Sequence, residues 1–223
     1  MQSYFILKNR TDMKKIIVTI FMLTGILLSV NSQEEEGLGF SAGDKNLEVN
    51  LRPAHDFPVQ MNYLKGRYFI DSNMAVRGGL EFDLASSTDE GDNWESTERV
   101  IDLGLYPGIE MHFPISERLT PYFGGELGFL TRATRSYEEN GVDREVKNAN
   151  GFNRIELNAV GGFDFYVYKG LYLGVEVSYG FTRQSFKDRE TTVNGTTTTD
   201  ENNEVNYFLG DGVNTGIRLG WAF

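Results

Sequence analysis

The chain of 223 residues has no cysteine and only two histidines. Without cysteine there is no disulfide, no thiolate-bound zinc and no cysteine nucleophile. Basic residues are also scarce, because 21 lysines and arginines stand against 32 aspartates and glutamates. The resulting net charge of −11 argues against a nucleic-acid partner, which would need a basic face.

The chain also lacks an apolar run long enough to cross a bilayer comfortably as a helix. Its longest run covers residues 16–30, preceded by Met13-Lys14-Lys15 and followed by Asn31-Ser32. A basic segment, an apolar segment and a small-residue end are typical of a secretory signal peptide. We predict a signal peptide over residues 1–32, with residues 1–12 as an upstream start extension; an uncleaved membrane anchor is the alternative.

Glycine and aromatic residues are abundant, at 25 glycines and 13% aromatics. Long segments alternate strictly between apolar and polar residues, and a period of two predicts strands with two different faces. In one such segment Ile101, Leu103 and Leu105 alternate with Asp102 and Gly104. The eight strands that we predict cover residues 47–52, 59–70, 74–84, 100–113, 121–137, 152–167, 171–186 and 205–223.

Two architectures produce such alternation: a soluble barrel with an apolar interior, and an outer-membrane barrel with a polar lumen. The signal peptide and the strand lengths, mostly above ten residues, favour the membrane barrel. Short loops also alternate with long polar ones at residues 85–99, 138–151 and 187–204. Aromatic residues near the strand ends predict interfacial girdles: Phe69, Phe113, Phe123, Tyr168 and Phe223 at one end, and Phe152, Phe181, Phe186 and Tyr207 towards the other.

The short turns predict the pairing of neighbouring strands. A three-residue loop at residues 168–170 pairs Tyr166 with Tyr172 and puts Gly170 in the left-handed conformation. Residues 71–73 fit the same form, with Asn73 in the left-handed position.

The second of these turns also pairs Arg67 with Arg77 on the inner face. Two adjacent arginines repel each other. They therefore need carboxylates from neighbouring strands, for which Glu81, Asp102 and Glu110 are the candidates.

Charged residues on the inner faces predict a network in the lumen. Its members are Arg67, Arg77, Glu81, Asp83, Asp102, Glu110, Glu126, Arg154, Glu156, Asp164, Glu176 and Arg218; Glu48, Arg52 and Arg132 also face inward. This network is either a polar conduit or a plug. Eight strands leave room for side chains and little else, which favours the plug.

Three segments carry a resemblance to a known family. Residues 65–80 (KGRYFIDSNMAVRGGL) resemble its second hairpin, and residues 119–128 (LTPYFGGELG) resemble its strand start L-x-P-Y-x-G-x-x-x-G. Residues 217–223 (IRLGWAF) resemble the terminal strand that the outer-membrane assembly machinery reads. The family is that of small outer-membrane barrels of the OmpA/OmpX type, and more closely the "porin family" outer-membrane β-barrel proteins of Bacteroidota.

The resemblance covers residues 40–223 and implies fold and location more strongly than activity. It implies an all-β protein, an eight-stranded antiparallel up-and-down transmembrane barrel over residues 46–223, after an N-terminal periplasmic segment at residues 33–45. It also implies an assembly signal made of Ile217, Leu219, Trp221 and Phe223.

No pattern in the sequence predicts a catalytic, cofactor or metal site. His55 and Asp56, with Ser86 and Ser87 in the next external loop, could form a lipid-modifying centre at the rim, but a solvated histidine is favoured. The acidic loop at residues 86–98 lacks the spacing of a calcium-binding EF-hand. Residues 191–203 form a polar, low-complexity surface loop.

We therefore expect a non-enzymatic outer-membrane protein of a Gram-negative bacterium, without a cofactor and monomeric. Its plugged barrel and acidic loops would serve structural, adhesive or partner-binding roles. The expected partners are outer-membrane lipid and lipopolysaccharide, the assembly machinery, and a surface or envelope protein. The alternatives are a narrow channel for polar solutes or protons, a rim lipid-A-modifying enzyme, and an accessory subunit of a larger envelope complex.

Overall fold

The computed structural model describes residues 40–51, 59–91, 94–139, 141–210 and 214–223. The predicted signal peptide, Arg52 and the loop with His55 and Asp56 lie outside these residues. Twelve strands form one antiparallel sheet: β1 (Lys45–Leu51), β2 (Val59–Asp71), β3 (Met74–Gly91), β4 (Trp94–His112), β5 (Leu119–Glu139), β6 (Asp143–Lys147), β7 (Phe152–Tyr168), β8 (Leu171–Phe186), β9 (Arg189–Val193), β10 (Thr196–Asp200), β11 (Val205–Leu209) and β12 (Asn214–Ala222). Within the described ranges, no helix is long and apolar enough to cross a membrane.

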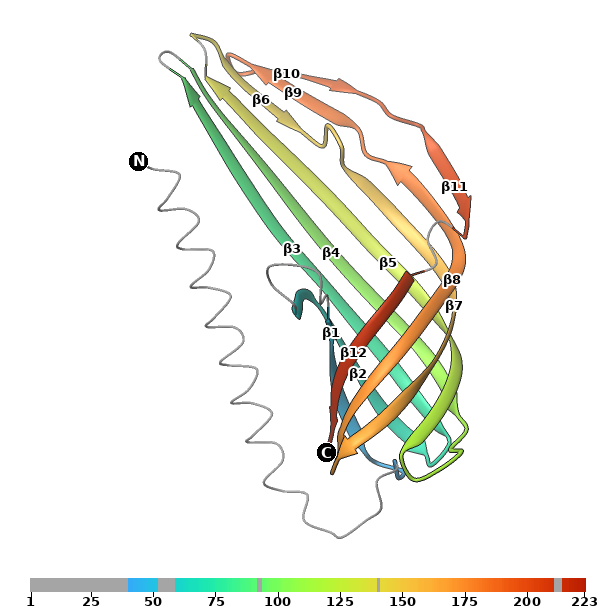
Figure 1. Ribbon diagram of the computed structural model, residues 1–223. Helices are drawn as coiled ribbons and strands as arrows, with labels where there is room; N and C mark the ends of the chain where they lie inside the picture. Colours follow the sequence, from blue (N-terminus) through green and yellow to red (C-terminus); the bar gives the residue numbers. More distant parts are fainter. Residues whose placement is uncertain (1–39, 52–58, 92–93, 140, 211–213) are drawn as a thin grey trace.

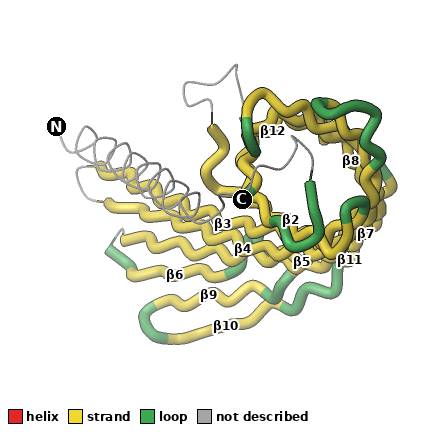
Figure 2. Tube along the Cα trace, turned by 90° about the horizontal axis from the view of Figure 1, so that it is seen from below, coloured by secondary structure: helices red, strands yellow, loops and turns green. Residues whose placement is uncertain are grey.

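Eight of the strands close into a ring, which Figure 2 shows end-on. The neighbours follow the order β1–β2–β3–β4–β5–β7–β8–β12, and β12 pairs back onto β1. The last contact joins Lys45 and Phe223, whose backbones exchange two hydrogen bonds of 2.8 and 3.0 Å. Closure leaves no free edge around the lower part of the molecule.

The alternating sequence sorts the side chains of the ring into two groups. On β3, Arg77 points inward and is 1% exposed, whereas Leu80 points outward and is 57% exposed. The same division holds on β7, where Asp164 is buried and Leu157 is exposed. The buried core is therefore polar and the outer surface apolar, the reverse of a soluble barrel.

Most of the residues in the three predicted long loops that the structure describes are strand, and this corrects the sequence prediction. Strands β3 and β4 stay paired up to Gly91 and Trp94, and β5 continues to Glu139. β6 pairs with β5 and β9, and β9 pairs with β10. These strands form what we call the outer sheet, which rises beyond the ring in Figure 1 and lies to one side of it in Figure 2.

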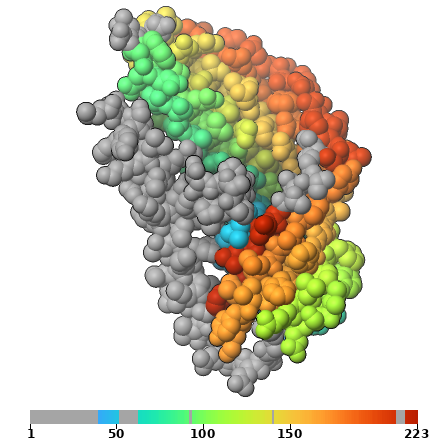
Figure 3. Space-filling view, viewed as in Figure 1, coloured from blue at the N-terminus to red at the C-terminus, as the bar shows by residue number. Residues whose placement is uncertain are grey.

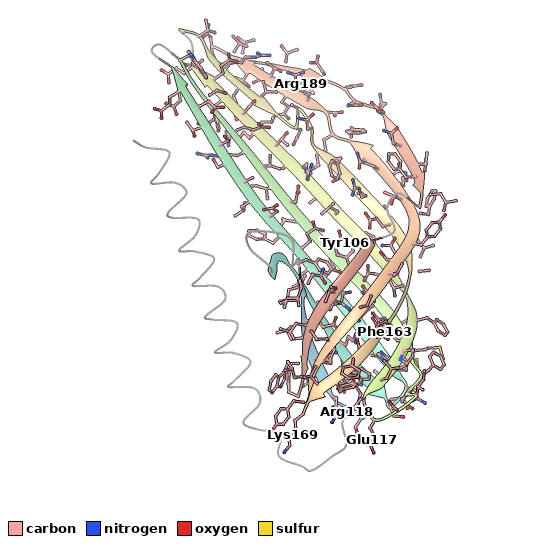
Figure 4. The ribbon with its side chains drawn as sticks, in the orientation of Figure 1. Tyr106, Glu117, Arg118, Phe163, Lys169 and Arg189 are labelled. Atoms are coloured by element: carbon pink, nitrogen blue, oxygen red, sulfur yellow. The ribbon has the colours of Figure 1, made fainter. Side chains whose placement is uncertain are left out.

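The outer sheet and the short turns occupy opposite ends of the molecule. Figure 4 places Glu117, Arg118 and Lys169 at the turn end, and Arg189 on the projecting part. In the space-filling view the projecting part forms one continuous surface from the β3–β4 tip to the orange and red segments of the chain (Figure 3).

The predicted eighth strand is divided in two. Leu209 of β11 pairs with Phe181 of β8, whereas Asn214 of β12 pairs with Ser178. The sum of the paired residue numbers is 390 for the first pair and 392 for the second, so the register of β12 on β8 is shifted by two residues from that of β11. Alternation alone does not reveal such a register shift.

The predicted three-residue turn at residues 168–170 is only partly correct. Tyr168 pairs with Leu171, so the loop contains only Lys169 and Gly170, and the register shifts between Tyr166 and Tyr168. The inner pair and the glycine conformation are as expected. Tyr166 pairs with Tyr172, and Gly170 has a φ of 71°. At the other turn Arg67 pairs with Arg77 as expected, but Asn73 is absent from the residues with positive φ. Asp71 pairs directly with Met74 there, so the loop is tighter than the predicted form.

The predicted aromatic girdles are only partly correct. Phe113, Phe123 and Tyr168 are exposed near the turn end. Phe69 and Phe152 are buried instead, because their strand positions face the lumen. Distance from a strand end therefore does not by itself place an aromatic residue in the membrane interface.

Candidate functional site

A network of charged side chains fills the ring on the side of the short turns. Each member occupies an inward position of its strand, so the alternation of the sequence brings them together. The network contains the cations Lys65, Arg67, Arg77 and Arg218 and the carboxylates Glu48, Glu110, Glu126, Asp164 and Glu176. These come from all eight ring strands, so the network connects the ring across its interior.

Two arginines share two carboxylates at the centre of the network. Arg67 lies 2.5 Å from Asp164 Oδ2 and 2.9 Å from Glu48 Oε1. Arg218 lies 2.5 Å from Glu48 Oε2 and 2.8 Å from Asp164 Oδ1. Opposite charges therefore alternate around a closed cycle, which offsets the cost of removing each from water.

Arg77 contacts a second group of carboxylates. Its guanidinium lies 2.5 Å from Glu110, 3.0 Å from Glu126 and 3.0 Å from Glu176. Lys65 contacts the same Glu176 at 2.5 Å. A single arginine therefore compensates carboxylates from β4, β5 and β8.

Tyr122 covers the network from β5. Its hydroxyl donates to Glu176 at 2.6 Å, and its ring lies 4.6 Å from the Arg67 guanidinium carbon and 5.1 Å from that of Arg218. Gly162 makes room for this ring, because an added Cβ would lie 2.7 Å from the tyrosine hydroxyl. The inward glycines thus give the large inner side chains space.

An aromatic layer closes the ring at the turn end. Phe40, just before β1, stacks on Phe69 with a centroid distance of 3.8 Å. Its ring also meets the rings of His112, Tyr166 and Tyr172 edge-on at 5.3 to 6.0 Å. The N-terminal segment therefore completes the floor of the lumen.

The lumen is also occupied further up, towards the outer sheet. Arg132 binds Asp102 through two hydrogen bonds of 2.7 and 2.6 Å. Arg154 donates twice to Gln184, and the guanidinium carbons of both arginines lie about 5 Å from the Phe152 ring. These pairs extend the filling of the lumen above the charge network.

Some of the predicted lumen residues lie in the charge network near the short turns, and the others lie in the upper lumen. Of the three carboxylates expected to compensate Arg67 and Arg77, only Glu110 does so, at 2.8 Å and 2.5 Å. Asp102 pairs with Arg132 instead, and Glu81 accepts a hydrogen bond from Tyr106 at 2.7 Å. Glu81 lies four residues beyond Arg77 on β3, and Asp102 lies eight residues before Glu110 on β4, so both are too far along their strands to reach the arginine pair.

The remaining predicted members lie around the upper lumen. Glu156 accepts a hydrogen bond from Asn158 at 3.3 Å and lies 3.6 Å from Arg154. Asp83 is opposite Asp102 in the register and forms none of the ion pairs found among the described residues.

Sequence reasoning missed Lys65 and the role of Tyr122. Lys65 lies two residues before Arg67 and therefore on the same face of β2, which is a signal that the sequence contained. No equivalent signal distinguishes Tyr122 from the other inward tyrosines, because its role depends on contacts with three other strands.

The outer sheet presents a second charged feature. Glu90, Glu95, Glu139 and Asp143 are direct neighbours in the register of β3, β4, β5 and β6. Like charges placed opposite each other destabilise a sheet. A hollow of about 410 Å³ adjoins this row and includes Tyr137 in its lining. Within the described part of the chain, no group of carboxylates or histidines is arranged to hold a metal ion.

The structure describes only two of the four rim residues considered for catalysis, so it does not bring the four together. Ser86 and Ser87 lie on the extension of β3, paired with Arg99 and Glu98 of β4. His55 and Asp56 lie outside the described residues.

Comparison with known proteins gives a family and a distant structural likeness. The family model described as "Putative OmpA-OmpF-like porin family" matches residues 92–205. No curated protein matches the sequence. The crystal structure of Ail, the attachment invasion locus protein of Yersinia pestis, aligns at 11% identity with a TM-score of 0.35, covering 81% of this chain and 99% of that one.

Proposed function

Because the chain belongs to the OmpA-OmpF-like porin family, we propose that it is an outer-membrane β-barrel with a plugged lumen, acting through its outer sheet and without enzymatic activity. The chain is exported by its signal peptide and inserted as a monomer. Residues 217–223 present the terminal strand to the assembly machinery. The apolar outer surface contacts membrane lipid, and the projecting end lies outside the cell beside the lipopolysaccharide.

The buried charge network is the observation that carries the plugged lumen. Arg77, Arg218, Glu48, Glu110 and Asp164 are each at most 1% exposed, so water does not reach them freely. Their ion pairs cross the interior from one wall to the other. A solute could pass only if several buried pairs were separated, at a cost of several kcal/mol for each uncompensated charge.

The outer sheet supports a structural, adhesive or partner-binding role. Among the described strands, β10 ends the sheet and pairs only with β9, so one side of its backbone is free of strand pairing there. All five of its residues are exposed. A free strand edge is a template to which an extended segment of another protein can add.

Conductance measurements test the plugged lumen. We expect the purified full-length protein, reconstituted in a planar lipid bilayer, to give no stable single-channel current. A reproducible unit conductance in the wild type, absent from protein-free bilayers, would contradict the proposal. Heat-modifiable migration on a gel verifies that the reconstituted protein is folded.

A narrow channel for small polar solutes or protons is the second candidate. It is favoured by the acidic residues above the network, since Glu81, Asp83 and Glu156 are only half-buried. If the chain is a channel, neutralising lumen carboxylates in the variant Glu110→Gln with Glu126→Gln changes its conductance. An unchanged current in that variant would argue against conduction through this lumen.

A subunit role is tested separately by gentle extraction. Tagged protein is extracted from native outer membranes in mild detergent and sized by native mass spectrometry. A single chain supports the autonomous barrel. A defined larger complex would make the chain an accessory subunit and identify its partner. A lipid-A mass shift that His55→Ala abolishes would instead indicate the rim enzyme.

A further inference from the structure

The outer surface of the ring changes from apolar to polar along a line that crosses β5 and β7. Phe129 and Ile155, paired in the register, are 45% and 46% exposed. The next outward row consists of Thr131, Asn153 and Ser185, again direct neighbours across β5, β7 and β8. An uncharged polar row thus lies immediately beyond the apolar surface.

A lysine is held over this polar row. Lys187 directly follows β8, and its ammonium donates to Thr131 Oγ1 at 2.8 Å. The Thr131 hydroxyl in turn donates to Asn153 Oδ1 at 2.9 Å. The backbone of Lys187 is fixed as well, by a hydrogen bond of 2.9 Å to the Gly151 carbonyl. The ammonium is therefore positioned by the fold.

An arginine borders the same row from below. Arg183 lies two residues before Ser185 on β8, on the same face, and is half-buried. Its register neighbours are Ile155 of β7 and Tyr207 of β11, both exposed apolar or aromatic residues. Arg183 is thus a charged residue in a row whose neighbouring members are apolar or aromatic.

Neither cation has a carboxylate partner among the ion pairs of the described residues. Burial lowers the pKa of the Lys187 ammonium, and no carboxylate opposes this effect. The acidic residues nearby are engaged elsewhere. Asp188 accepts a hydrogen bond from the Asn202 backbone at 2.9 Å, and Glu204 accepts one from the Asn206 side chain at 3.0 Å.

We propose that Lys187, Arg183, Asn153 and Ser185, here called the basic corner, bind the phosphate of an anionic lipid headgroup in the outer leaflet. A phosphate offers only acceptors, and the corner offers an ammonium, a guanidinium and an amide donor. The Ser185 hydroxyl makes only a long hydrogen bond of 3.4 Å to the Asn153 carbonyl and can turn to supply a fourth donor. The apolar surface directly below, around Phe129, accommodates the acyl chains of the same molecule. This apolar contact favours a lipid over a free phosphate ion.

The inference rests on the proposed location in the outer membrane. Basic side chains at the edge of an apolar surface are placed where headgroup charges are found. The outer sheet carries other cations, but those of Arg135 and Arg144 are already paired with Glu145 and Glu138. Arg99 and Arg189 of the outer sheet likewise form none of the ion pairs of the described residues. The basic corner is distinguished from all four by two unpaired cations beside one polar row at the edge of the apolar surface.

The test measures lipid retention by the full-length protein in a non-ionic detergent, using native mass spectrometry. The probe is phosphatidylglycerol, and phosphatidylcholine is the zwitterionic control. We expect selective retention of phosphatidylglycerol. The variant Lys187→Gln with Arg183→Gln should weaken its apparent affinity about tenfold or more, because two charge-assisted contacts are lost.

The matched control is Arg144→Gln with Arg189→Gln, which removes the same charge from the outer sheet and should leave retention unchanged. Equal retention by both double variants, or equal retention of both lipids, would overturn the proposal. Complete displacement of phosphatidylglycerol by millimolar inorganic phosphate would also overturn it, because the corner would then be a site for free phosphate. Heat-modifiable migration shows that each variant is folded.

Cell fractionation separates this inference from the proposed function. Wild-type protein found outside the outer membrane would refute the location while leaving binding in detergent unaffected. Protein in the outer membrane that retains phosphatidylglycerol no better than phosphatidylcholine would refute only the basic corner.

Discussion

Arg67 and Arg77 stand directly opposite each other inside the ring, an arrangement that is unfavourable by itself. It persists because Glu110 lies between them, 2.8 Å from one and 2.5 Å from the other. At the scale of the residue, the interior is therefore stable because opposite charges offset each other. Each buried charge depends on partners from other strands.

Removal of the Arg77 side chain measures this dependence. Arg77→Ala leaves Glu110, Glu126 and Glu176 without a shared cation in a buried site. We expect the free energy of unfolding to fall by about 3–5 kcal/mol, the usual cost of breaking a buried pair. Urea unfolding in detergent micelles measures the loss. The matched control Arg118→Ala, in a short exposed turn, should change stability by less than about 1 kcal/mol.

A second residue-scale prediction concerns pH and the outer sheet. Arg135 donates to the Glu145 carboxylate and thereby holds the pKa of Glu145 below its ordinary value. Because the pKa is lower in the folded state, ionised Glu145 stabilises the β5–β6 pairing above the ordinary pKa. This stabilisation is lost as pH falls through the lowered value.

Carboxyl NMR titration checks this prediction. Arg135→Gln should raise the Glu145 midpoint towards the ordinary value. Lys147→Gln should raise it less, because its ammonium lies 4.0 Å away and contributes more weakly. Identical midpoints in the wild type and Arg135→Gln would show that the pair does not form in solution.

At the scale of the element, the β9–β10 hairpin shows how local chemistry fixes a strand edge. Asn194 and Gly195 both have positive φ, 49° and 79°, as a two-residue hairpin turn of this kind requires. The pair flanking such a turn exchanges hydrogen bonds, and the pairs then alternate. The N–H groups of Thr196 and Thr198 therefore face β9, whereas those of Thr197 and Thr199 face outward.

Proline substitution tests this assignment. Thr198→Pro removes an N–H that bonds to β9, so hydrogen exchange in β9 and β10 should accelerate, with a loss of about 1 kcal/mol in local stability. Thr197→Pro removes an outward N–H and should change exchange much less. The opposite order would mean that the hairpin has the other register.

At the scale of the whole molecule, ring closure depends on the two ends of the described chain meeting. Lys45 and Phe223 exchange two backbone hydrogen bonds where β1 and β12 join. Phe223→Ser keeps this backbone but removes the terminal aromatic side chain of the predicted assembly signal.

We expect Phe223→Ser to reduce the heat-modifiable folded band in the outer-membrane fraction several-fold. Phe113→Ser removes an exposed aromatic residue near the same end without touching the terminal strand, and it should retain wild-type levels. Equal levels in both variants would show that Phe223 does not guide insertion.

The ring itself could be predicted, because apolar and polar residues alternate with a period of two along its strands. Strand β8 was predicted with its observed bounds, and the inward faces of β3, β4, β7 and β8 followed from alternation alone. The outer sheet was predicted as loops because its strands are polar on both faces. A strand is recognised in a sequence by the difference in polarity between its two faces, and a strand exposed on both faces has no such difference. The Asn140-Gly141 and Asn194-Gly195 pairs were the local signals of hairpins there.

For the candidate site, the sequence by itself determined which residues face the lumen, and tertiary structure decided which of them meet. Alternation assigns a side to every residue of a strand, because successive side chains point to opposite faces. Partners such as Arg218 and Asp164 lie 54 residues apart and meet only because the ring closes. Pair formation depends on the stagger of all eight ring strands, including β12, whose register on β8 is shifted from that of β11. That stagger is a property of the closed sheet, and no single strand encodes it.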